Sequence, residues 1–283
     1  MKTLGILGPK GTHSEEAALW LKKHSRENFT VEICADIFDV LNAVKERRLD
    51  AGLVPVENSL EGSINITLDT LARSDTLTIS RELVWQVKNF LMTKPLADVK
   101  AVKKIFSHAQ PLAQCRKFLH KNFPDVEIVA TTSTARAAEI VASANENFAA
   151  ICTERAGKLH GLTIAAKDIQ DNPNNFTRFF EISYRPRDAA PIETFDGDKV
   201  LIICQIDGSR AGSLCSVLEE FAKRNVNMTR IESRPARTIL GAYIFFFELE
   251  TDAGDAALRD AIRAVYDKSI WLKNLGAFPV IQA

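Results

Sequence analysis

The sequence predicts an α/β protein with a two-lobed N-terminal region and a smaller C-terminal domain. Short apolar runs alternate with stretches whose apolar residues recur at helical spacing, and this alternation restarts near residue 77. A segment at 185–197 with Pro, Gly and charged residues then precedes a different order of elements. The chain has 283 residues, more than one ordinary core accommodates, which also favours several domains.

The first lobe is predicted from strands at 3–7, 31–34 and 51–56, each followed by a helix, with helices beginning near residues 12, 36 and 63. Asp36 is a candidate helix cap, because the apolar residues after it recur at helical spacing: Ile37, Val40, Leu41 and Val44. This βαβαβ order predicts a parallel sheet with helices on its faces.

The second lobe repeats this pattern. An extended stretch at 77–91 leads to strands ending at 106 and spanning 127–130 and 148–152, with helices at 111–118 and 134–144 and a last strand at 177–183. Two α/β lobes joined by long connections predict a cleft between them, and such pairs resemble periplasmic-binding-protein folds. That likeness concerns the fold and assigns no function.

The C-terminal part has a different order. It reads as a strand at 200–206, a helix at 213–224, strands at 228–233 and 243–250, a helix at 256–265 and a strand at 270–275. This is the βαββαβ order of the ferredoxin-like split unit. We therefore predict a first domain at 1–184, a linker at 185–197 and a second domain at 198–283.

Composition argues against several classes of partner. Lys plus Arg number 36 and Asp plus Glu number 36, so no overall basic field attracts nucleic acid or an anionic membrane. No run approaches the roughly 18 apolar residues of a membrane helix. Five scattered cysteines without a CxxC pair indicate a reducing compartment. We expect a cytoplasmic protein that binds neither nucleic acid nor a membrane.

The segment 8–14 (GPKGTHS) joins the first strand to the first helix. Its free N–H groups suit an anion, and a tight turn with a Thr12 or Ser14 cap explains it equally well. A dinucleotide fingerprint needs G-x-G-x-x-G, whereas the glycines stand at positions 5, 8 and 11. The five histidines are scattered without paired spacing, so neither a metal nor another cofactor is expected.

Two further segments place polar side chains where a strand ends. Asn58 and Ser59 follow the third strand, at the edge where parallel sheets bind ligands, and they suit a carboxylate or hydroxyl. The glutamates of this segment are better explained by pairing with a base and by capping the next helix. Ser107 and His108 lie at the corresponding place in the second lobe. A structural hydrogen bond is the more frequent role of a lone histidine, although His108 can titrate near neutrality.

Five segments in order resemble the prephenate dehydratase family: GPKGTHS, VPVENSLEGS, SHAQPLAQC, TTSTA and NNFTRF. The resemblance covers about residues 3–183. It implies the removal of water and carbon dioxide from prephenate to give phenylpyruvate, in phenylalanine biosynthesis. The threonine of TRF is essential in that family, which makes Thr177 the predicted catalytic residue. The predicted substrate-binding residues are Thr12, Asn58, Ser59, Ser107, His108, Arg178 and Phe179.

Arg178 has two possible roles. A planar guanidinium is a natural clamp for the substrate's pyruvyl carboxylate. Neighbouring side chains of a strand point to opposite faces, however, so Thr177 and Phe179 share one face and Arg178 lies on the other. Either the strand is bent at this point or Arg178 is structural.

The C-terminal part resembles an ACT domain, a small amino-acid-binding module, through GSLC at 212–215 and NMTRIESRP at 227–235. The family loop usually reads GALV, so Ser213 and Cys215 depart from it. The resemblance implies that phenylalanine binds near a subunit interface of a homodimer or homotetramer and inhibits the first region. The predicted effector residues are Gly212, Ser213, Leu214, Asn227, Glu232, Ser233 and Arg234.

Two other hypotheses remain open at this point. Arogenate dehydratase differs from prephenate dehydratase by an amino group on the substrate, and one sequence does not separate the two. A sensor that binds amino acids without catalysis is the other, and the intact TRF segment favours the enzyme over it.

Overall fold

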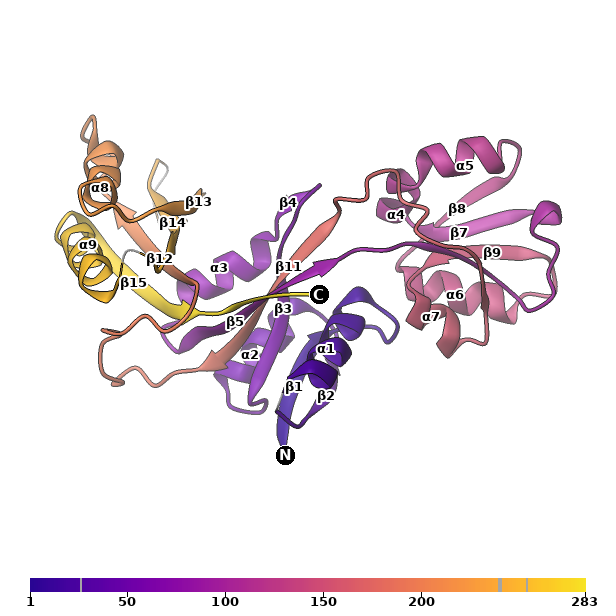
Figure 1. The fold of residues 1–283 in the computed structure, drawn as a ribbon, viewed down its shortest axis with the longest axis horizontal. Helices are drawn as coiled ribbons and strands as arrows, with labels where there is room; N and C mark the ends of the chain where they lie inside the picture. Colours follow the sequence, from indigo (N-terminus) through magenta and orange to yellow (C-terminus); the bar gives the residue numbers. More distant parts are fainter. Residues whose placement is uncertain (26, 239–240, 253) are drawn as a thin grey trace.

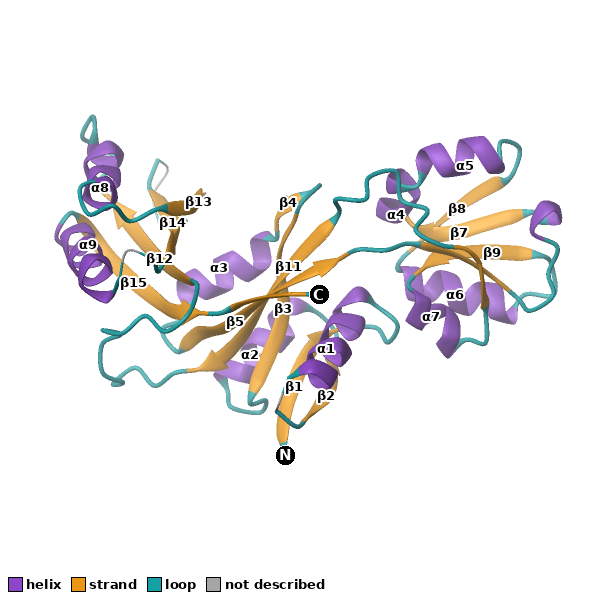
Figure 2. Cartoon of the chain, viewed as in Figure 1, coloured by secondary structure: helices purple, strands orange, loops and turns teal. Residues whose placement is uncertain are grey.

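The computed structural model describes residues 1–283 except 26, 239–240 and 253, and it contains three β-sheets with helices around them (Figures 1 and 2). The sheet of the first lobe has the order β16-β5-β11-β3-β1-β2, with β4 beside β3. Its strands are β1 (Lys2–Leu7), β2 (Phe29–Cys34), β3 (Ala51–Asn58), β4 (Gly62–Ser63), β5 (Leu77–Gln86), β11 (Phe176–Tyr184) and β16 (Val280–Gln282).

This first sheet is mixed rather than parallel. β1 is parallel to β2 and β3, as predicted, but β11 runs antiparallel to both β3 and β5. Asp36 caps the second helix as expected, because its side chain accepts a hydrogen bond from the Asp39 N–H. The helices of this lobe are α1 (His13–His24), α2 (Ile37–Lys45) and α3 (Asn65–Arg73).

The second lobe has a five-stranded sheet in the order β10-β6-β9-β7-β8. Its strands are β6 (Phe90–Thr93), β7 (Lys104–His108), β8 (Glu127–Thr131), β9 (Phe148–Cys152) and β10 (Thr163–Ala166). Its helices are the 3₁₀ turn η1 (Val99–Ala101), α4 (Ala109–Gln114), α5 (Arg116–Asn122), α6 (Thr134–Ser143) and α7 (Glu154–Leu159). The single helix expected at 111–118 is broken at the buried Cys115, whose backbone leaves the helical region.

Two segments cross between the lobes side by side, after β5 and before β11 (Figure 1). Val87 N–H donates to the Asn175 carbonyl at 2.8 Å, and Ile169 N–H donates to the Asn89 carbonyl at 3.1 Å. These bonds make the connection a short two-stranded link. The predicted pair of α/β lobes is therefore confirmed. The placement of two strands was wrong, because β5 and β11, expected in the second lobe, belong to the sheet of the first.

The C-terminal domain confirms the predicted βαββαβ order. Its elements are β12 (Lys199–Ile206), α8 (Ser213–Ala222), β13 (Met228–Pro235), β14 (Tyr243–Glu250), α9 (Asp255–Asp267) and β15 (Ser269–Phe278). The antiparallel sheet has the order β13-β14-β12-β15, and α8 and α9 cover one face. None of the helices in the described part of the chain is long and apolar enough to cross a membrane.

The other face of this sheet packs against the first lobe in one continuous apolar core. Phe246, Leu275 and Phe278 of the C-terminal part cluster with Ile79 and Phe180 of the first lobe. After β15 the chain returns to the first lobe, where β16 pairs in parallel with β5. The division at 184 and 198 stays a prediction, but the last residues of the chain belong to the sheet of the first lobe.

A fragment that ends at residue 197 should lose stability because it uncovers this shared core. Burial of one large apolar side chain is worth about 1.5–3 kcal/mol, and several are uncovered at once. We expect the fragment to bind a hydrophobic dye and to unfold at a lower temperature than the full chain. A chain that ends at residue 278, and so lacks only β16, should show a smaller loss. Equal unfolding temperatures for fragment and full chain would contradict the shared core.

Candidate active site

The carboxyl ends of the strands in the two lobes face each other. The loop after β1 touches the loop after β9, where the Thr153 hydroxyl donates to the Gly11 carbonyl at 2.6 Å. Gly11 has a φ of +85°, and a Cβ there would lie 2.8 Å from the Cα of Ala156, so a larger residue does not fit. Glu15 and Arg155 form an ion pair across the same contact at 2.7 Å. Ligands of α/β sheets bind at such edges.

Thr177 is held at this edge by Asn58. The Nδ2 of Asn58 lies 3.1 Å from the Thr177 Oγ1, 2.9 Å from the Asn175 Oδ1 and 3.2 Å from the Phe176 carbonyl. An amide group has only two hydrogens, and the Phe176 carbonyl is the most distant acceptor and already accepts from the Ser59 N–H at 2.8 Å, so the two hydrogens go to Asn175 and Thr177. Because Asn58 is the donor, the Thr177 hydroxyl keeps its own hydrogen for another acceptor.

Two residues of this network were not singled out from the sequence. Asn175 accepts from Asn58 and donates through its Nδ2 to the Oε1 of Gln114 at 2.9 Å. Gln114 ends α4 of the second lobe, so the chain of amides runs from the first lobe to the second. Both lie in segments that carried the family resemblance, NNFTRF and SHAQPLAQC, and this was the available signal.

Two more predicted residues lie in the first lobe. The Ser59 hydroxyl donates to the Asn174 carbonyl at 3.0 Å and accepts from the Phe176 N–H at 2.9 Å, so it fastens the start of β11. Thr12 precedes α1 but forms no side-chain cap, and its hydroxyl donates to the Leu7 carbonyl at 3.3 Å. The expected helix cap from the glutamate after Leu60 is also absent, since α3 begins without a side-chain cap.

Three other predicted substrate-binding residues make structural contacts away from Thr177. Ser107 is fully buried and donates to the Ile151 carbonyl at 2.7 Å. His108 accepts from the Gln110 N–H at 3.4 Å and thereby caps α4, which supports its structural interpretation. Phe179 is buried in the core beneath α1. Within the described residues no hydrogen bond joins these three side chains to Thr177.

Arg178 is surrounded by carboxylates. Its Nη1 lies 2.7 Å from Glu57, its Nε lies 2.6 Å from Glu82, and its Nη2 donates to Glu248 of the C-terminal domain. Lys199 lies 2.9 Å from Glu248 and 3.3 Å from Glu82. Glu57 thus pairs with a base as expected. These contacts favour the structural role of Arg178 over the carboxylate clamp, although the register of β11 against β3 does shift directly after Arg178.

The carboxylate of Glu248 is charged because of its neighbours. Burial alone would raise its pKa, but the ion pairs with Arg178 and Lys199 outweigh burial and lower the pKa to about 2. Burial likewise opposes the charge on Arg178, and the carboxylates of Glu82 and Glu248 nevertheless raise its pKa. Glu248 and Arg178 are therefore both charged at neutral pH.

Within one chain, the predicted effector residues lie in two places, the loop and first turn of α8 and the segment 227–234 along β13. Gly212, at φ +81°, precedes α8 and lines a cavity of about 500 Å³ together with Ser213, Arg210 and Lys268. Leu214, in the first turn of α8, packs partly against the core of this domain, and Asn227 donates to Glu250 at 2.8 Å.

The ESRP segment divides between the two faces of β13. Glu232 accepts from Ser63, and Arg234 lies 2.7 Å from Asp69 of α3, so both contact the first lobe. Ser233 lies between them and is exposed on the opposite face. By strand alternation Ser233 therefore points to the side on which α8 lies.

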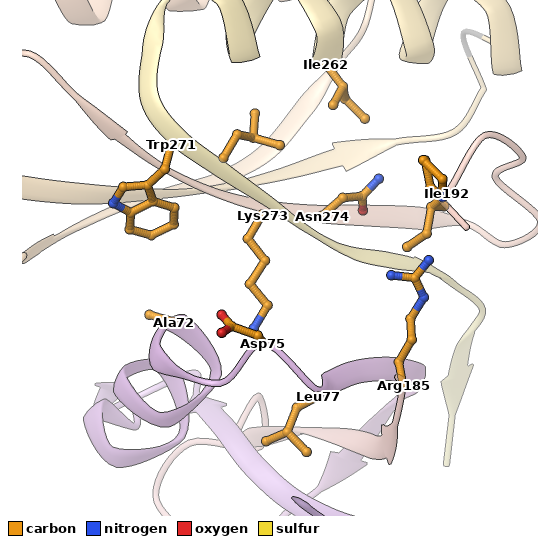
Figure 3. A pocket seen from close by; sticks show the side chains of 11 residues that line it. Ala72, Asp75, Leu77, Arg185, Ile192, Ile262, Trp271, Lys273 and Asn274 are labelled. Atoms are coloured by element: carbon orange, nitrogen blue, oxygen red, sulfur yellow. The ribbon is translucent and has the colours of Figure 1, made fainter. Parts of the chain in front are cut away.

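A further cavity of about 580 Å³ lies between α3, the linker and β15 (Figure 3). Lys273 reaches across it to the end of α3 and donates to the carbonyls of Leu71, at 2.7 Å, and Ser74. Burial lowers the pKa of Lys273 to about 8. This cavity holds none of the predicted site residues. Among the described residues no cluster of three or more His, Cys, Asp or Glu side chains is arranged to hold a metal.

Sequence and structure comparisons identify relatives along the whole chain. The family model described as prephenate dehydratase matches residues 4–187, and the one described as ACT domain matches residues 201–265. The chain is 38% identical over 276 residues to the bifunctional chorismate mutase/prephenate dehydratase of Aquifex aeolicus, a match that covers 98% of this chain and 73% of the relative. It is 34% identical over 273 residues to the prephenate dehydratase of Methanocaldococcus jannaschii, with 96% of each chain covered.

A solved structure agrees with these matches. The prephenate dehydratase of Arthrobacter aurescens in complex with L-Phe has a TM-score of 0.86 and 33% sequence identity to this chain. The match covers 98% of this chain and 90% of that chain.

Glu248→Gln should flatten the acid dependence of stability. The pKa of Glu248 lies near 2 in the folded protein, below its ordinary value of 4.5, so its stabilising effect is complete above that ordinary value and is lost as the pH falls toward 2. The difference in unfolding free energy between wild type and variant should therefore shrink between about pH 5 and about pH 3 in urea titrations. A difference that stays constant over this range would show that the ion pairs do not hold Glu248 ionised.

Proposed function

The chain belongs to the prephenate dehydratase family, and we propose that it acts on prephenate at the strand edge that carries Thr177 and Asn58. The reaction is the decarboxylating dehydration of prephenate to phenylpyruvate in phenylalanine biosynthesis. The observation that carries the proposed site is the hydrogen-bonded chain from Thr177 through Asn58 and Asn175 to Gln114, which joins both lobes where the strand ends meet.

The reaction makes few demands on the protein. The bond from the ring to its carboxylate breaks, its electrons move through the ring, and the bond to the opposite hydroxyl breaks. Carbon dioxide leaves, hydroxide takes up a proton to become water, and aromatisation drives the step. The ring carboxylate loses its charge in the transition state, so strong binding of that group would slow the reaction. The protein must instead orient the substrate and stabilise the departing oxygen.

Thr177 is arranged to assist the departing oxygen. Asn58 donates to the Thr177 Oγ1 at 3.1 Å, so the hydroxyl hydrogen is free to point at a substrate oxygen. A threonine is too weak an acid to give up its proton, but its hydrogen bond strengthens as negative charge develops on the leaving hydroxide. The free hydroxyl hydrogen therefore supports Thr177 as the catalytic residue.

The predicted substrate residues now fall into two groups. Asn58 and Ser59 shape the site through their contacts with the start of β11, and Thr12 borders the contact between the lobes. His108 and Ser107 lie at the carboxyl end of β7 in the second lobe, where Ser107 is fully buried and His108 caps α4. The amide chain contains no cation, so the carboxylate clamp is not provided by these residues.

Phenylalanine, the end product of the pathway, inhibits the enzyme by feedback through the ACT domain. We propose that it binds beside the Gly212 loop, where the N–H groups at the start of α8 suit its carboxylate. Two or four copies would associate through β13, which is an edge strand and carries the exposed Ile231, and through the exposed Tyr243 of β14. The five thiols are unpaired, which fits a cytoplasmic protein.

Thr177→Ala should fold normally and lose most of its turnover. Loss of a positioned donor to a reacting group lowers the rate roughly 100- to 10,000-fold, or about 3–5 kcal/mol of barrier. The measurement is kcat for phenylpyruvate formation, with circular dichroism to establish the fold. Thr177→Ser retains the hydroxyl and should retain most of the rate. A folded alanine variant with near-normal kcat would remove Thr177 from the mechanism.

Prephenate and arogenate should be supplied separately to the wild-type protein, with phenylpyruvate and phenylalanine assayed as products. We expect turnover of prephenate. Turnover of arogenate alone, or of neither compound, would contradict the proposed substrate.

A further inference from the structure

Strand β11 presents neighbouring residues to two different environments. Thr177 lies opposite Asn58 of β3, and Arg178 lies opposite Glu57 of the same strand. Because adjacent side chains of a strand point to opposite faces, Thr177 joins the amide chain while Arg178 faces the C-terminal domain. The guanidinium lies 5.9 Å from the ring centre of Phe180, the next residue on the same face.

Arg178 is held from two domains at once. Glu57 and Glu82 of the first lobe accept from its Nη1 and Nε at 2.7 and 2.6 Å. Glu248 of β14 accepts from its Nη2, and Glu248 also accepts from the hydroxyl of Thr229 at 2.7 Å. Glu248 is 1% exposed, so water does not replace these partners. The guanidinium position therefore depends on a strand of the regulatory domain.

The charges of the cluster make this dependence strong. Three carboxylates surround Arg178, and the second cation that reaches Glu82 and Glu248 is Lys199, again from the C-terminal domain. If that domain moves away from β11, Arg178 loses one anion and the fully buried Glu82 loses one cation. Interactions between buried charges are strong because the local dielectric is low. A displacement of β14 would thus pull the guanidinium toward its remaining partners.

The polar contacts of the ESRP segment (232–235) and of the nearby Arg237 with α3 lie away from β11. Arg234 and Arg237 pair with Asp69 of α3 at 2.7 and 2.5 Å. Glu232 accepts from Ser63, which lies just before α3. These contacts join the same two domains without touching the strand of Thr177, so they provide an internal control.

We propose that Arg178 is a positioning residue through which Glu248 of the ACT domain controls the placement of Thr177. This inference rests on the function proposed above and adds the route of its regulation. Phenylalanine alters the enzyme only if it prefers one arrangement of the domains over another. In the active arrangement Glu248 holds Arg178 and β11 in place, and in the inhibited arrangement this ion pair is broken and the Thr177 hydroxyl leaves its position.

Two variants of the full-length protein test this route. Glu248→Gln removes the ion pair with Arg178, and Asp69→Asn removes a contact between the same two domains that does not involve β11. Phenylalanine binding is measured by calorimetry, and kcat and KM for prephenate are measured with and without saturating phenylalanine. A typical allosteric coupling changes kcat/KM roughly 5- to 150-fold in the wild type. We expect Glu248→Gln to bind phenylalanine, to have a lowered kcat without phenylalanine because the ion pair is already lost, and to reduce this factor below about 2, while Asp69→Asn keeps it.

Each other result overturns the proposal. Full inhibition of Glu248→Gln, or equal loss of inhibition in both variants, would assign regulation to the interface as a whole. If Glu248→Gln does not fold, Lys199→Gln removes the other cation from Glu248 and must weaken inhibition in its place. A wild-type protein that does not convert prephenate would instead refute the proposed function, so the two failures are distinguishable.

Arg178→Lys tests the positioning role directly. A lysine retains the charge but does not reach three carboxylates with a planar fork. We expect a lower kcat with KM for prephenate within about twofold of the wild type, since the residue does not touch the substrate. A raised KM with unchanged kcat would identify Arg178 as the carboxylate clamp and overturn the proposal.

Discussion

The alternation of side chains along β11 is the constraint on which both sites depend. This strand pairs with β3 on one side and β5 on the other, near the middle of the largest sheet. Its position in the sheet fixes Thr177 beside Asn58 and, one residue later, Arg178 beside Glu57. The catalytic hydroxyl and the ion-pair cluster are therefore two faces of one rigid element, and neither shifts without the other.

Apolar contacts hold the C-terminal domain against the first lobe, and ion pairs set its orientation. The shared core that contains Phe180 and Phe278, with ring centres 5.4 Å apart, supplies the favourable free energy of docking. Buried ion pairs contribute little net stability, because desolvation offsets their attraction. Their geometry is directional, however, and it sets how the sheet of the C-terminal domain lies against β11. A domain held by apolar contacts and aligned by ion pairs is able to shift without detaching.

Local patterns in the sequence were sufficient to predict the main order of elements. They also predicted that Thr177 and Arg178 face opposite sides of their strand. Apolar periodicity predicted the two lobes and the βαββαβ domain, and strand alternation placed Arg178 away from Thr177. The partners of Arg178 were not predictable, because Glu82 and Glu248 lie 96 and 70 residues away along the chain. The same holds for β16, whose three residues pair with a strand formed some 200 positions earlier. The sheet was predicted to be parallel, but β11 lies antiparallel between β3 and β5. This pairing also joins segments that are far apart along the chain.

Side chains along β13 alternate between two faces of the sheet, as they do along β11. On β13, Glu232 and Arg234 turn toward the first lobe, while Ser233 turns to the side of α8. The cavity beside the α8 loop is lined by Gly212, Lys268 and Ile270, at the β15 side of the sheet. The face of β13 that carries Glu232 and Arg234 is fastened to Ser63 and Asp69. Since β13 pairs with β14, a displacement of β13 also acts on Glu248. Two adjacent strands of the sensor domain therefore reach the catalytic lobe. Strand β13 reaches α3 through Arg234 and Glu57 through Arg230, and β14 reaches β11 through the ion pair of Glu248 with Arg178.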